Sequence, residues 1–330
     1  MASLPNQCKA WVWRGNQFPS DLKLKSVPIP TLHSDDVLVQ NQAIGLNPVD
    51  WKVLNMKINT IPGVDGAGVV VAVGKNVPAS LIGLCVAYHQ DLRRSGSFAE
   101  YTPVKANALI LLPETMDYVT AAGIPCPALT AWQALEKIPV KPNRTLLISG
   151  AGGSVGHYLT QLAAARGFIV SVLANPRHRE HLTALGAHHF LDNRQWSELL
   201  QQEPNFYAVI DAVSPERAYE LAALVQANGH LVAIQGRTEQ WPTQPFSQAI
   251  SLHEVALGAL HQYGNDSDWQ ELTNAGKHLL RHIASGQLRA EQIHISGFTE
   301  LAQKLDALKN RNFTGKLRSE EHTSELQSHS

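Results

Sequence analysis

The stretch Thr145-Leu-Leu-Ile-Ser149 and the residues after it, Gly150-Ala-Gly-Gly-Ser-Val-Gly156, decide the fold. The first part predicts a buried strand, and the glycine-rich part opens a predicted helix over 155–166. Glycines permit a tight turn in which backbone N–H groups approach a pyrophosphate, and the helix N-terminus supplies partial positive charge. The predicted phosphate-binding residues are Gly150, Gly152, Gly153, Ser154, Val155 and Gly156. Because glycines also mark plain structural turns, the prediction depends on the segments around them.

The segments that follow this turn alternate between strand and helix patterns. Strands are expected at 168–173, 189–191, 207–210 and 230–234, and helices at 179–185, 195–202 and 216–227. Such an alternation builds βαβ units with right-handed crossovers on a parallel sheet. We therefore predict an α/β fold in which residues 123–262 form a doubly wound parallel sheet of the Rossmann type, with a dinucleotide on the glycine-rich turn.

The residues before this region have a different pattern. From 9 to about 120, short strand-like runs such as 37–44 and 68–73 are separated by Pro and Gly. This pattern predicts a compact β-rich domain or barrel over residues 1–122. Helical patterns at 267–285 and 298–310 come after the parallel-sheet region, and we expect 263–317 to return and complete the first domain.

The type of dinucleotide is indicated by the end of the second expected strand. An NAD site usually carries Asp or Glu there, about 20 residues after the glycines, to bind the ribose hydroxyls. This chain has Ala174-Asn-Pro-Arg-His-Arg179 instead. Two guanidinium groups and no carboxylate suit a 2′-phosphate, so Asn175, Arg177 and Arg179 predict NADPH as the cofactor. The alternative is that both arginines are solvated charges at the start of a helix.

Charge and cysteine usage exclude several classes of protein. The 27 Lys and Arg residues nearly balance the 28 Asp and Glu residues, which gives no electrostatic reason to expect a nucleic-acid or anionic-membrane partner. Cys8, Cys85 and Cys126 lie far apart, without the spacing of a disulfide framework or a cysteine zinc site. No apolar run is long enough to span a membrane, and 1–11 lacks the pattern of a signal peptide. We expect a cytoplasmic protein.

The last residues are treated separately. Arg318–Ser328 reads RSEEHTSELQS, has no periodic pattern, and resembles the translation of a sequencing-adapter oligonucleotide. We therefore exclude 318–330 from the expected fold and predict an artefactual, disordered tail. The alternative is a natural disordered tail.

Several motifs together resemble one protein family. They are Gly45-Leu-Asn-Pro-Val-Asp-Trp-Lys52, Pro62-Gly-Val-Asp-Gly-Ala-Gly-Val-Val70, Gly96-Ser-Phe-Ala-Glu-Tyr101, Leu129-Thr-Ala-Trp132, Gly186-Ala-His-His-Phe-Leu-Asp192 and Gly315-Lys316. With the glycine-rich turn between them, the chain resembles the medium-chain dehydrogenase/reductase superfamily over about 9–317. Within it, the chain is similar to the zinc-free quinone oxidoreductases, which include zeta-crystallin and plant enone reductases.

The resemblance implies an architecture and an assembly. It implies that the β-rich part is a GroES-like catalytic domain and that the active site lies in a cleft beside the nucleotide-binding domain. It also implies homodimers that pair through the last strand of the nucleotide domain, at about 252–260. Thr130 resembles the residue that contacts the nicotinamide end of the cofactor, and Lys316 is carried over as a cofactor-binding residue.

The same resemblance argues against a metal. Zinc-dependent alcohol dehydrogenases of this superfamily hold their catalytic zinc with Cys, His and Cys. The corresponding positions here are Asn47, Val64 and Cys126, of which only the cysteine is a zinc ligand. We therefore predict no metal site.

Without a Lewis acid, a hydride acceptor needs a built-in electron sink. An α,β-unsaturated ketone or aldehyde, or a quinone, has one, and the protein must then supply hydrogen-bond donors and a proton. By resemblance, Lys52 is the expected donor to the enolate oxygen and Asn47 positions the substrate or the cofactor ribose. Tyr88 either lines the cleft or packs in the interior.

Three functions remain open at this point. The first is an NADPH-dependent reductase of enones, enals or quinones. The second is a quinone reductase that hardly accepts linear enones. The third is a non-enzymatic NADPH-binding protein with a structural or regulatory role, as in some zeta-crystallin relatives. Asn47 and Lys52 together favour an enzyme.

Overall fold

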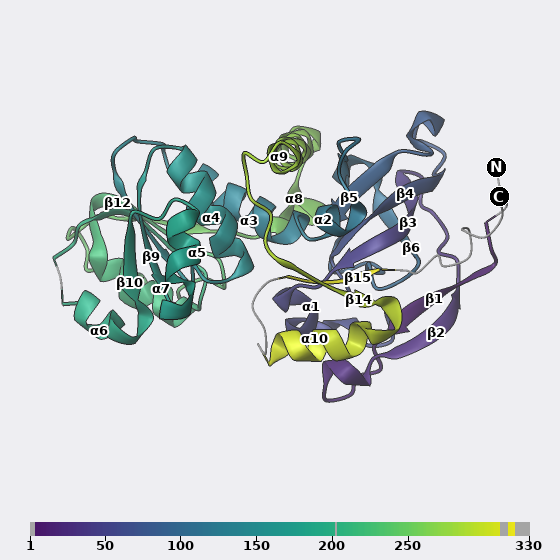
Figure 1. Cartoon of the computed structure of the whole chain (residues 1–330), viewed down its shortest axis with the longest axis horizontal. Coiled ribbons are helices and arrows are strands. Elements are labelled where there is room, and N and C mark those ends of the chain that lie inside the picture. The colour runs from purple at the N-terminus through teal and green to yellow at the C-terminus, as the bar shows by residue number, and fades with distance from the viewer. Residues whose placement is uncertain (1–3, 202, 311–315, 321–330) are drawn as a thin grey trace. The chain divides into compact units, whose positions relative to one another are not determined.

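The computed structural model describes residues 4–201 and 203–310, and the backbone of 316–320 (Figure 1). The chain divides into two compact units, one of residues 1–126 with 258–330 and the other of residues 127–257. The sequence placed these divisions at 122/123 and 262/263. The first division falls inside helix α3 (Pro125–Glu136), so that one continuous helix contributes to both units.

The second unit, 127–257, is built on a six-stranded parallel sheet with the order β10-β9-β8-β11-β12-β13 (Figure 1). Its strands are β8 (Thr145–Ser149), β9 (Ile169–Ala174), β10 (His189–Asp192), β11 (Phe206–Asp211), β12 (Val225–Ala233) and β13 (Ser251–Glu254). Its helices are α4 (Ser154–Ala165), α5 (Arg179–Ala184), α6 (Trp196–Leu199) and α7 (Pro215–Leu221). From the central β8 the chain adds strands first on one side and then on the other. This order confirms the predicted doubly wound sheet.

One helix of this unit is shorter than the sequence indicated. The predicted helix over 216–227 ends as α7 at Leu221, and a short 3-10 turn (Ala222–Leu224) leads directly into β12 at Val225. Val225 is fully buried and pairs with Phe206 of β11. Burial in the sheet therefore overrides the helical pattern of this segment.

The first unit is β-rich and contains the sheet β14-β15-β3-β4-β5-β7, with β6 also pairing with β3. Its strands are β3 (Asp36–Gly45), β4 (Asp65–Val73), β5 (Cys85–His89), β6 (Tyr101–Lys105), β7 (Leu109–Leu111), β14 (Ile293–Gly297) and β15 (Lys316–Glu320). A separate ladder joins β1 (Gln7–Val12) to β2 (Lys23–Pro28). Its helices, besides the start of α3, are α1 (Pro48–Lys52), α2 (Tyr118–Ala122), α8 (Leu260–Tyr263), α9 (Asp266–Ala284) and α10 (Leu301–Lys309).

The C-terminal segment returns to the first unit, as expected, but it extends further than the sequence indicated. β15 lies between β14 and β3, with Arg318, Ser319 and Glu320 opposite Gly45, Ile44 and Ala43. The prediction of a disordered tail from 318 is therefore wrong for 318–320, where pairing with two strands fixes the backbone. The remainder of that prediction, 321–330, lies outside the described residues.

Helix lengths and compositions in the described residues show no segment that meets the requirement for a transmembrane helix.

Candidate functional site

The glycine-rich turn lies between β8 and α4 and carries Gly150, Gly152 and Gly153, while the other three predicted phosphate-binding residues open α4. Gly150 has φ +74°, a left-handed conformation that glycine adopts without strain. A Cβ on Gly156 would lie 2.4 Å from the Cα of Ala151, so only glycine lets the helix start so close to the turn. Gly153 precedes the first residue of α4, and a Cβ there would meet nothing closer than 3.6 Å. The N-terminus of α4 is therefore presented by a turn that two glycines make possible.

A histidine that the sequence did not single out packs against this turn. A Cβ on Gly152 would approach the His178 Cδ2 to 2.5 Å, and His178 is buried. The Arg177 Nε donates to the His178 Nε2 at 3.0 Å. Burial, with help from the Arg177 charge, lowers the pKa of His178, which is consistent with a neutral ring that accepts this hydrogen bond. The ring thus joins the turn to the arginine segment.

The three residues predicted to read the cofactor type lie directly after β9. Asn175, Arg177 and Arg179 are all exposed. The Asn175 Oδ1 accepts a hydrogen bond from the Arg177 amide at 3.1 Å and so caps the short turn. The Arg179 guanidinium lies 4.3 Å from the centroid of the Phe190 ring on β10. Two cationic groups therefore stand at the carboxyl end of the sheet, where doubly wound folds bind nucleotides.

The structure shows less about the other two predicted cofactor-binding residues, Thr130 and Lys316. Thr130 is nearly buried on α3, with 9% of its surface exposed. Lys316 begins β15, and its side chain lies outside the described residues.

Sequence reasoning missed Asp211, at the carboxyl end of β11. Its Oδ2 accepts hydrogen bonds from the amides of Val213 and Ser214, each at 3.0 Å. Burial raises its pKa. A buried carboxyl group at this edge of the sheet shapes the loop that follows β11.

In the first unit, Asn47 is the centre of a hydrogen-bonded loop between β3 and α1. Its amide donates to the Asp50 Oδ2 at 2.7 Å, and its Nδ2 donates to the Asp65 Oδ2 at 2.9 Å. The Asp50 Oδ1 accepts from the Val64 amide at 3.1 Å. Asn47, Asp50 and Asp65 are all almost completely buried. The expectation that the two aspartates brace this loop is confirmed.

Asp65 also binds a histidine that the sequence analysis did not select. The His89 Nδ1 lies 2.9 Å from the Asp65 Oδ1, and the backbone amide of Cys126 is 3.0–3.1 Å from both carboxylate oxygens. Asp65 and His89 are opposite each other in the antiparallel pair β4–β5, which puts their side chains on the same face. Asn47, Asp65, His89 and Cys126 therefore form one buried cluster, called the Asp65 cluster below.

This cluster contains the best candidate metal ligands in the described part of the chain. One ligand atom each of Asp65, His89 and Cys126 lies within 4.8 Å of the other two. However, the two oxygens of Asp65 already accept hydrogen bonds from Asn47, His89 and Cys126. A zinc ion would need the lone pairs that these donors occupy. The donor set therefore fits a hydrogen-bonded network better than a zinc site.

Lys52, the predicted hydrogen-bond donor to the enolate oxygen, lies at the end of α1. Its side chain is exposed, and its Nζ lies 5.8 Å from the centroid of the Trp51 ring.

The sequence analysis missed a second lysine, Lys57, in the segment that follows α1. It is only 3% exposed and donates to the backbone carbonyl of Arg94 at 2.5 Å. Burial lowers the pKa of Lys57, and the charges of Asp91 and Asp50 oppose that shift.

The structure contradicts the suggestion that Tyr88 lines a cleft. Tyr88 is fully buried within the first unit, and its hydroxyl donates to the Asn41 Oδ1 at 2.7 Å. The hydroxyl also lies over Gly66, where a Cβ would approach it to 2.4 Å. Burial raises the pKa of Tyr88 far above its usual value. The side chain therefore packs in the interior, which is the other role that the sequence left open.

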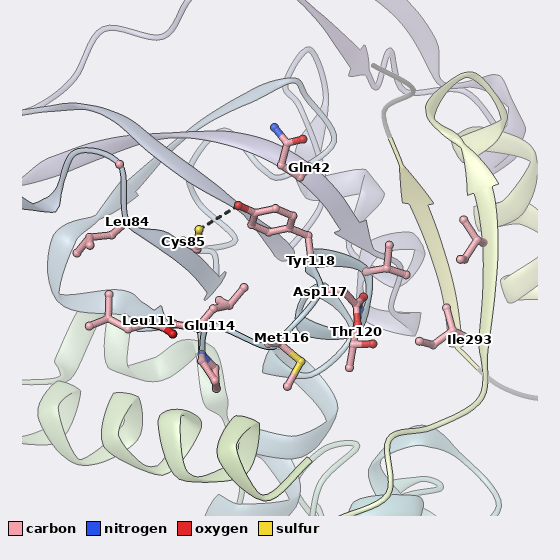
Figure 2. Close-up of a pocket in the computed structure, with 15 residues that line it drawn as sticks. Gln42, Leu84, Cys85, Leu111, Glu114, Met116, Asp117, Tyr118, Thr120 and Ile293 are labelled. Carbon is pink, nitrogen blue, oxygen red and sulfur yellow. Dashed lines mark hydrogen bonds between the residues drawn. The ribbon is translucent and has the colours of Figure 1, made fainter. Parts of the chain in front are cut away.

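A separate cavity of about 990 Å³ lies in the same unit (Figure 2). Figure 2 shows Tyr118 from α2 and Cys85 from β5 pointing toward one another, and the Sγ is 3.0 Å from the hydroxyl oxygen. Burial and the bond to Cys85 raise the pKa of Tyr118 to about 12. Other lining residues, including Leu111, Met116 and Ile293, are apolar. The residues that line this cavity do not include Asn47, Lys52 or the Asp65 cluster.

Comparisons with known proteins agree with this geometry. Residues 33–114 match the family model of the alcohol dehydrogenase GroES-like domain. The chain is 36% identical to a quinone oxidoreductase of Sus scrofa over 255 residues, which cover 72% of this chain and 77% of that protein. It is 31% identical to a chloroplastic NADPH-dependent alkenal/one oxidoreductase of Arabidopsis thaliana, over 71% of this chain and 64% of that protein.

The solved structures give the same fold. The quinone oxidoreductase of Coxiella burnetii superposes with a TM-score of 0.80, covering 95% of this chain and 99% of its own, at 24% identity. At that identity the likeness supports the fold alone. The names of the sequence relatives favour the predicted oxidoreductase over a non-enzymatic NADPH-binding protein. The chain spans a little under two thirds of the length of the Arabidopsis relative.

Proposed function

Because the chain belongs to the quinone oxidoreductase branch of the medium-chain dehydrogenase/reductase superfamily, we propose that it is an oxidoreductase that uses NADPH to reduce a conjugated carbonyl compound or a quinone. The observation that carries this proposal is the Asp65 cluster, in which Asn47 is held by a buried carboxylate at the position where zinc-dependent relatives carry a metal ligand. The hydrogen bond to Asp65 holds the Asn47 side chain in one orientation, which supports its assignment to the acceptor side of the reaction.

The preference for NADPH is supported by the second unit. The turn of Gly150, Gly153 and Gly156 offers the N-terminus of α4 to a pyrophosphate, and Arg177 and Arg179 offer positive charge to a 2′-phosphate. When bound, the cofactor supplies the hydride. In this proposal Thr130 lies along the cofactor, and Lys316 remains assigned to it by resemblance.

On the acceptor side, Asn47 orients the substrate or the cofactor ribose. Lys52, exposed at the end of α1, donates a hydrogen bond to the oxygen on which negative charge develops. The reaction is independent of zinc in this proposal, since the hydrogen bonds of Asp65 occupy the oxygens that a metal would need.

The proposal is tested by following NADPH oxidation with a linear enone and a naphthoquinone as matched acceptors, with the metal content measured on the same sample. We expect turnover of at least one acceptor, formation of the saturated ketone from the enone, and no stoichiometric zinc. Binding of NADPH without reduction of either acceptor would favour the non-enzymatic alternative. One zinc ion per chain, with activity lost to a chelator, would contradict zinc independence.

We also propose that the protein forms homodimers through β13. This strand is at the end of the parallel sheet, and among the described residues only β12 pairs with it. The exposed edge of a sheet offers backbone groups that a second copy can pair with across a two-fold axis. Sedimentation of the wild type and of Leu252→Pro tests this, because proline disturbs backbone pairing in β13, and thermal unfolding verifies that the variant is folded. Equal masses for the two proteins would argue against this interface.

The cytoplasmic location of the protein stays a prediction.

A further inference from the structure

We propose that the cavity beside Tyr118 and Cys85 is a separate ligand site, and that it binds a small organic cation with an apolar body (Figure 2). The inference does not depend on the proposed oxidoreductase function, because none of the residues assigned to that reaction takes part. The described residues that line the cavity all lie in the first unit, and they include neither Asn47, Lys52 nor the Asp65 cluster.

The cavity follows from the way in which α2 packs on the sheet. The helix has five residues, and its last two, both alanines, pack against alanines of β3, β4 and β5. Small side chains on both sides let this end of the helix approach the sheet closely. The larger side chains around its start, Met116, Tyr118 and Val119, are only partly buried, and they line the cavity.

Most of the lining is apolar, and part of it is exposed. Leu111, at the end of β7, keeps 39% of its surface exposed, and Ile295 on β14 keeps 58%. A ligand that covers these side chains removes apolar surface from water, which favours binding. The volume of about 990 Å³ is typical of a small-molecule site. The other apolar lining residues are Leu84, Leu112, Pro113, Met116, Val119 and Ile293.

The charges at the cavity are all negative. Glu114 and Asp117 line it, and among its described lining residues there is no Lys, Arg or His. Glu114 is exposed, and no ion pair joins it to another described residue. Asp117 uses its Oδ1 to accept a hydrogen bond from the Thr120 amide at 2.6 Å. Two carboxylates without an ion-pair partner attract a positively charged ligand and repel an anion.

A smaller adjoining cavity contains a cation that does not neutralise these carboxylates. This cavity of about 330 Å³ shares Met116, Asp117 and Thr120 with the first, and Arg289 lines it. Within the described part of the chain, no ion pair joins Arg289 to Asp117 or to Glu114. The two carboxylates are therefore available to the ammonium group of a ligand.

Tyr118 offers such a ligand two further contacts. Burial, followed by the bond to Cys85, raises the pKa of Tyr118 to about 12, so the phenol keeps its hydrogen near pH 7. Its oxygen lies 3.0 Å from the Cys85 Sγ. The face of the ring attracts a cation, and the hydroxyl oxygen has a lone pair for an ammonium donor. Apolar walls, an aromatic ring and two carboxylates together suit an amphiphilic amine.

The test compares three probes that share an eight-carbon chain: octylamine, 1-octanol and octanoate. At pH 7 their head groups carry a positive charge, no charge and a negative charge, while the apolar chain is the same in all three. Calorimetry on the full chain gives the dissociation constants. We expect octylamine to bind about tenfold more tightly than octanoate, with octanol between them, and the difference to shrink at high salt.

Two substitutions separate the charge from the apolar walls. Glu114→Gln should weaken octylamine binding about threefold, the size of an exposed ion pair, and leave octanol binding unchanged. The control is Glu271→Gln, which removes the same charge from an exposed position on α9 outside the cavity lining. Ile295→Gln should weaken binding of all three probes, whereas Ile58→Gln, exposed to a similar degree elsewhere in the unit, should not. Thermal unfolding verifies that the variants are folded.

Cys85 reports where the probe binds. It is exposed and lines the cavity, whereas Cys8 is buried and Cys126 is half-buried. Iodoacetamide, a small neutral reagent, should therefore alkylate Cys85 first, and peptide mass spectrometry identifies the modified residue. Bound octylamine should slow this alkylation in proportion to its occupancy. An unchanged rate at saturating octylamine would place the probe elsewhere on the protein and overturn the assignment of this cavity.

Tight binding of octylamine that depends on Glu114 and protects Cys85 would support the site. Equal affinities for the three probes would contradict the assignment to a cation, and so would tightest binding of octanoate. If the wild type does not bind octylamine, the cavity is not the site that we propose. None of these measurements uses NADPH or a hydride acceptor, so failure of the proposed function would leave their outcome unaffected.

Discussion

The two candidate binding regions for the proposed reaction differ in whether backbone or side-chain atoms form them. The phosphate turn of the second unit consists of backbone, and glycines determine its shape: Gly150 has a positive φ and Gly156 leaves no room for a Cβ. The Asp65 cluster of the first unit consists of side chains, with one buried carboxylate accepting hydrogen bonds from three different segments. The space around the backbone limits which residues the phosphate turn can carry, and the buried charge limits which residues the Asp65 cluster can carry.

The difference indicates how each region fails. A backbone site tolerates changes in pH and salt, but not an added methyl group. A buried carboxylate has lost its hydrogen bonds to water, so the stability of the cluster depends on each protein group that donates a hydrogen bond to it. Substitutions that add volume should therefore damage the second unit most, and substitutions that remove charge should damage the first.

The largest effect is expected for Asp65→Ala. The substitution removes the acceptor of Asn47, His89 and the Cys126 amide, all within the buried cluster. Removing one partner from such a site costs about 3–5 kcal/mol of unfolding free energy. Urea unfolding measures the loss. The control is Asp192→Ala in the second unit, whose carboxylate pairs with an exposed arginine and caps a short 3-10 turn, so it should cost only about 1 kcal/mol. Similar midpoints for both variants would contradict the importance of the cluster.

The next effect is a dependence of stability on acid. Burial lowers the pKa of His261 to about 4 from an ordinary value of 6.5. Between about pH 4 and 6.5, the unfolded chain therefore binds a proton at His261 that the folded chain does not bind. The contribution of His261 to stability is fully present above about pH 6.5 and declines as pH falls toward 4. A shift of this size corresponds to roughly 3 kcal/mol.

Urea unfolding at pH 7 and pH 5 tests this for the wild type and for His261→Gln. The variant should lose less stability between the two pH values than the wild type. The control His282→Gln, an exposed residue of α9, should keep the wild-type slope. An unchanged slope in His261→Gln would show that other groups cause the acid sensitivity.

Substitutions of two glycines at the phosphate turn separate an effect on stability from an effect on cofactor binding. Gly156→Ala brings a methyl group to 2.4 Å from the Cα of Ala151 and should cost about 1–3 kcal/mol of stability. Gly153→Ala meets ordinary contacts and should change stability by less than about 1 kcal/mol. If the turn holds a pyrophosphate, Gly153→Ala should still weaken NADPH binding, which calorimetry measures. Unchanged affinity in Gly153→Ala would mean that the turn is structural only.

The smallest effect concerns the choice of cofactor. Arg177→Ala together with Arg179→Ala should weaken NADPH binding about tenfold more than NADH binding, since each lost guanidinium removes a charge-assisted contact to the 2′-phosphate. Fluorescence titration with both cofactors gives the ratio, and Arg194→Ala, an exposed arginine paired with Asp192, is the control. Equal losses for NADPH and NADH would exclude this reading of Asn175–Arg179.

The contrast also explains what the sequence could reveal. The glycine-rich turn is one continuous segment, so its spacing predicted the strand, turn and helix correctly, and phosphate binding there stays a prediction. The Asp65 cluster is assembled from residues 47, 65, 89 and 126, and His89 reaches Asp65 only through the register of β4 and β5. No local pattern reports that register, which is why His89 was missed. Tyr88 was left open for the same reason, because its burial depends on Asn41 and Gly66.

The position of β15 has a consequence for the order in which the protein is made. The second unit is one uninterrupted stretch, 127–257, whereas the first needs both ends of the chain. During synthesis, β4 and β6 are available early to pair with β3, but residues 43–45 of β3 gain their second partner only when 318–320 have been made. An unprotected sheet edge is a site for aggregation. We therefore expect the first unit to complete its sheet only after 316–320 have been made, while the second unit folds without waiting.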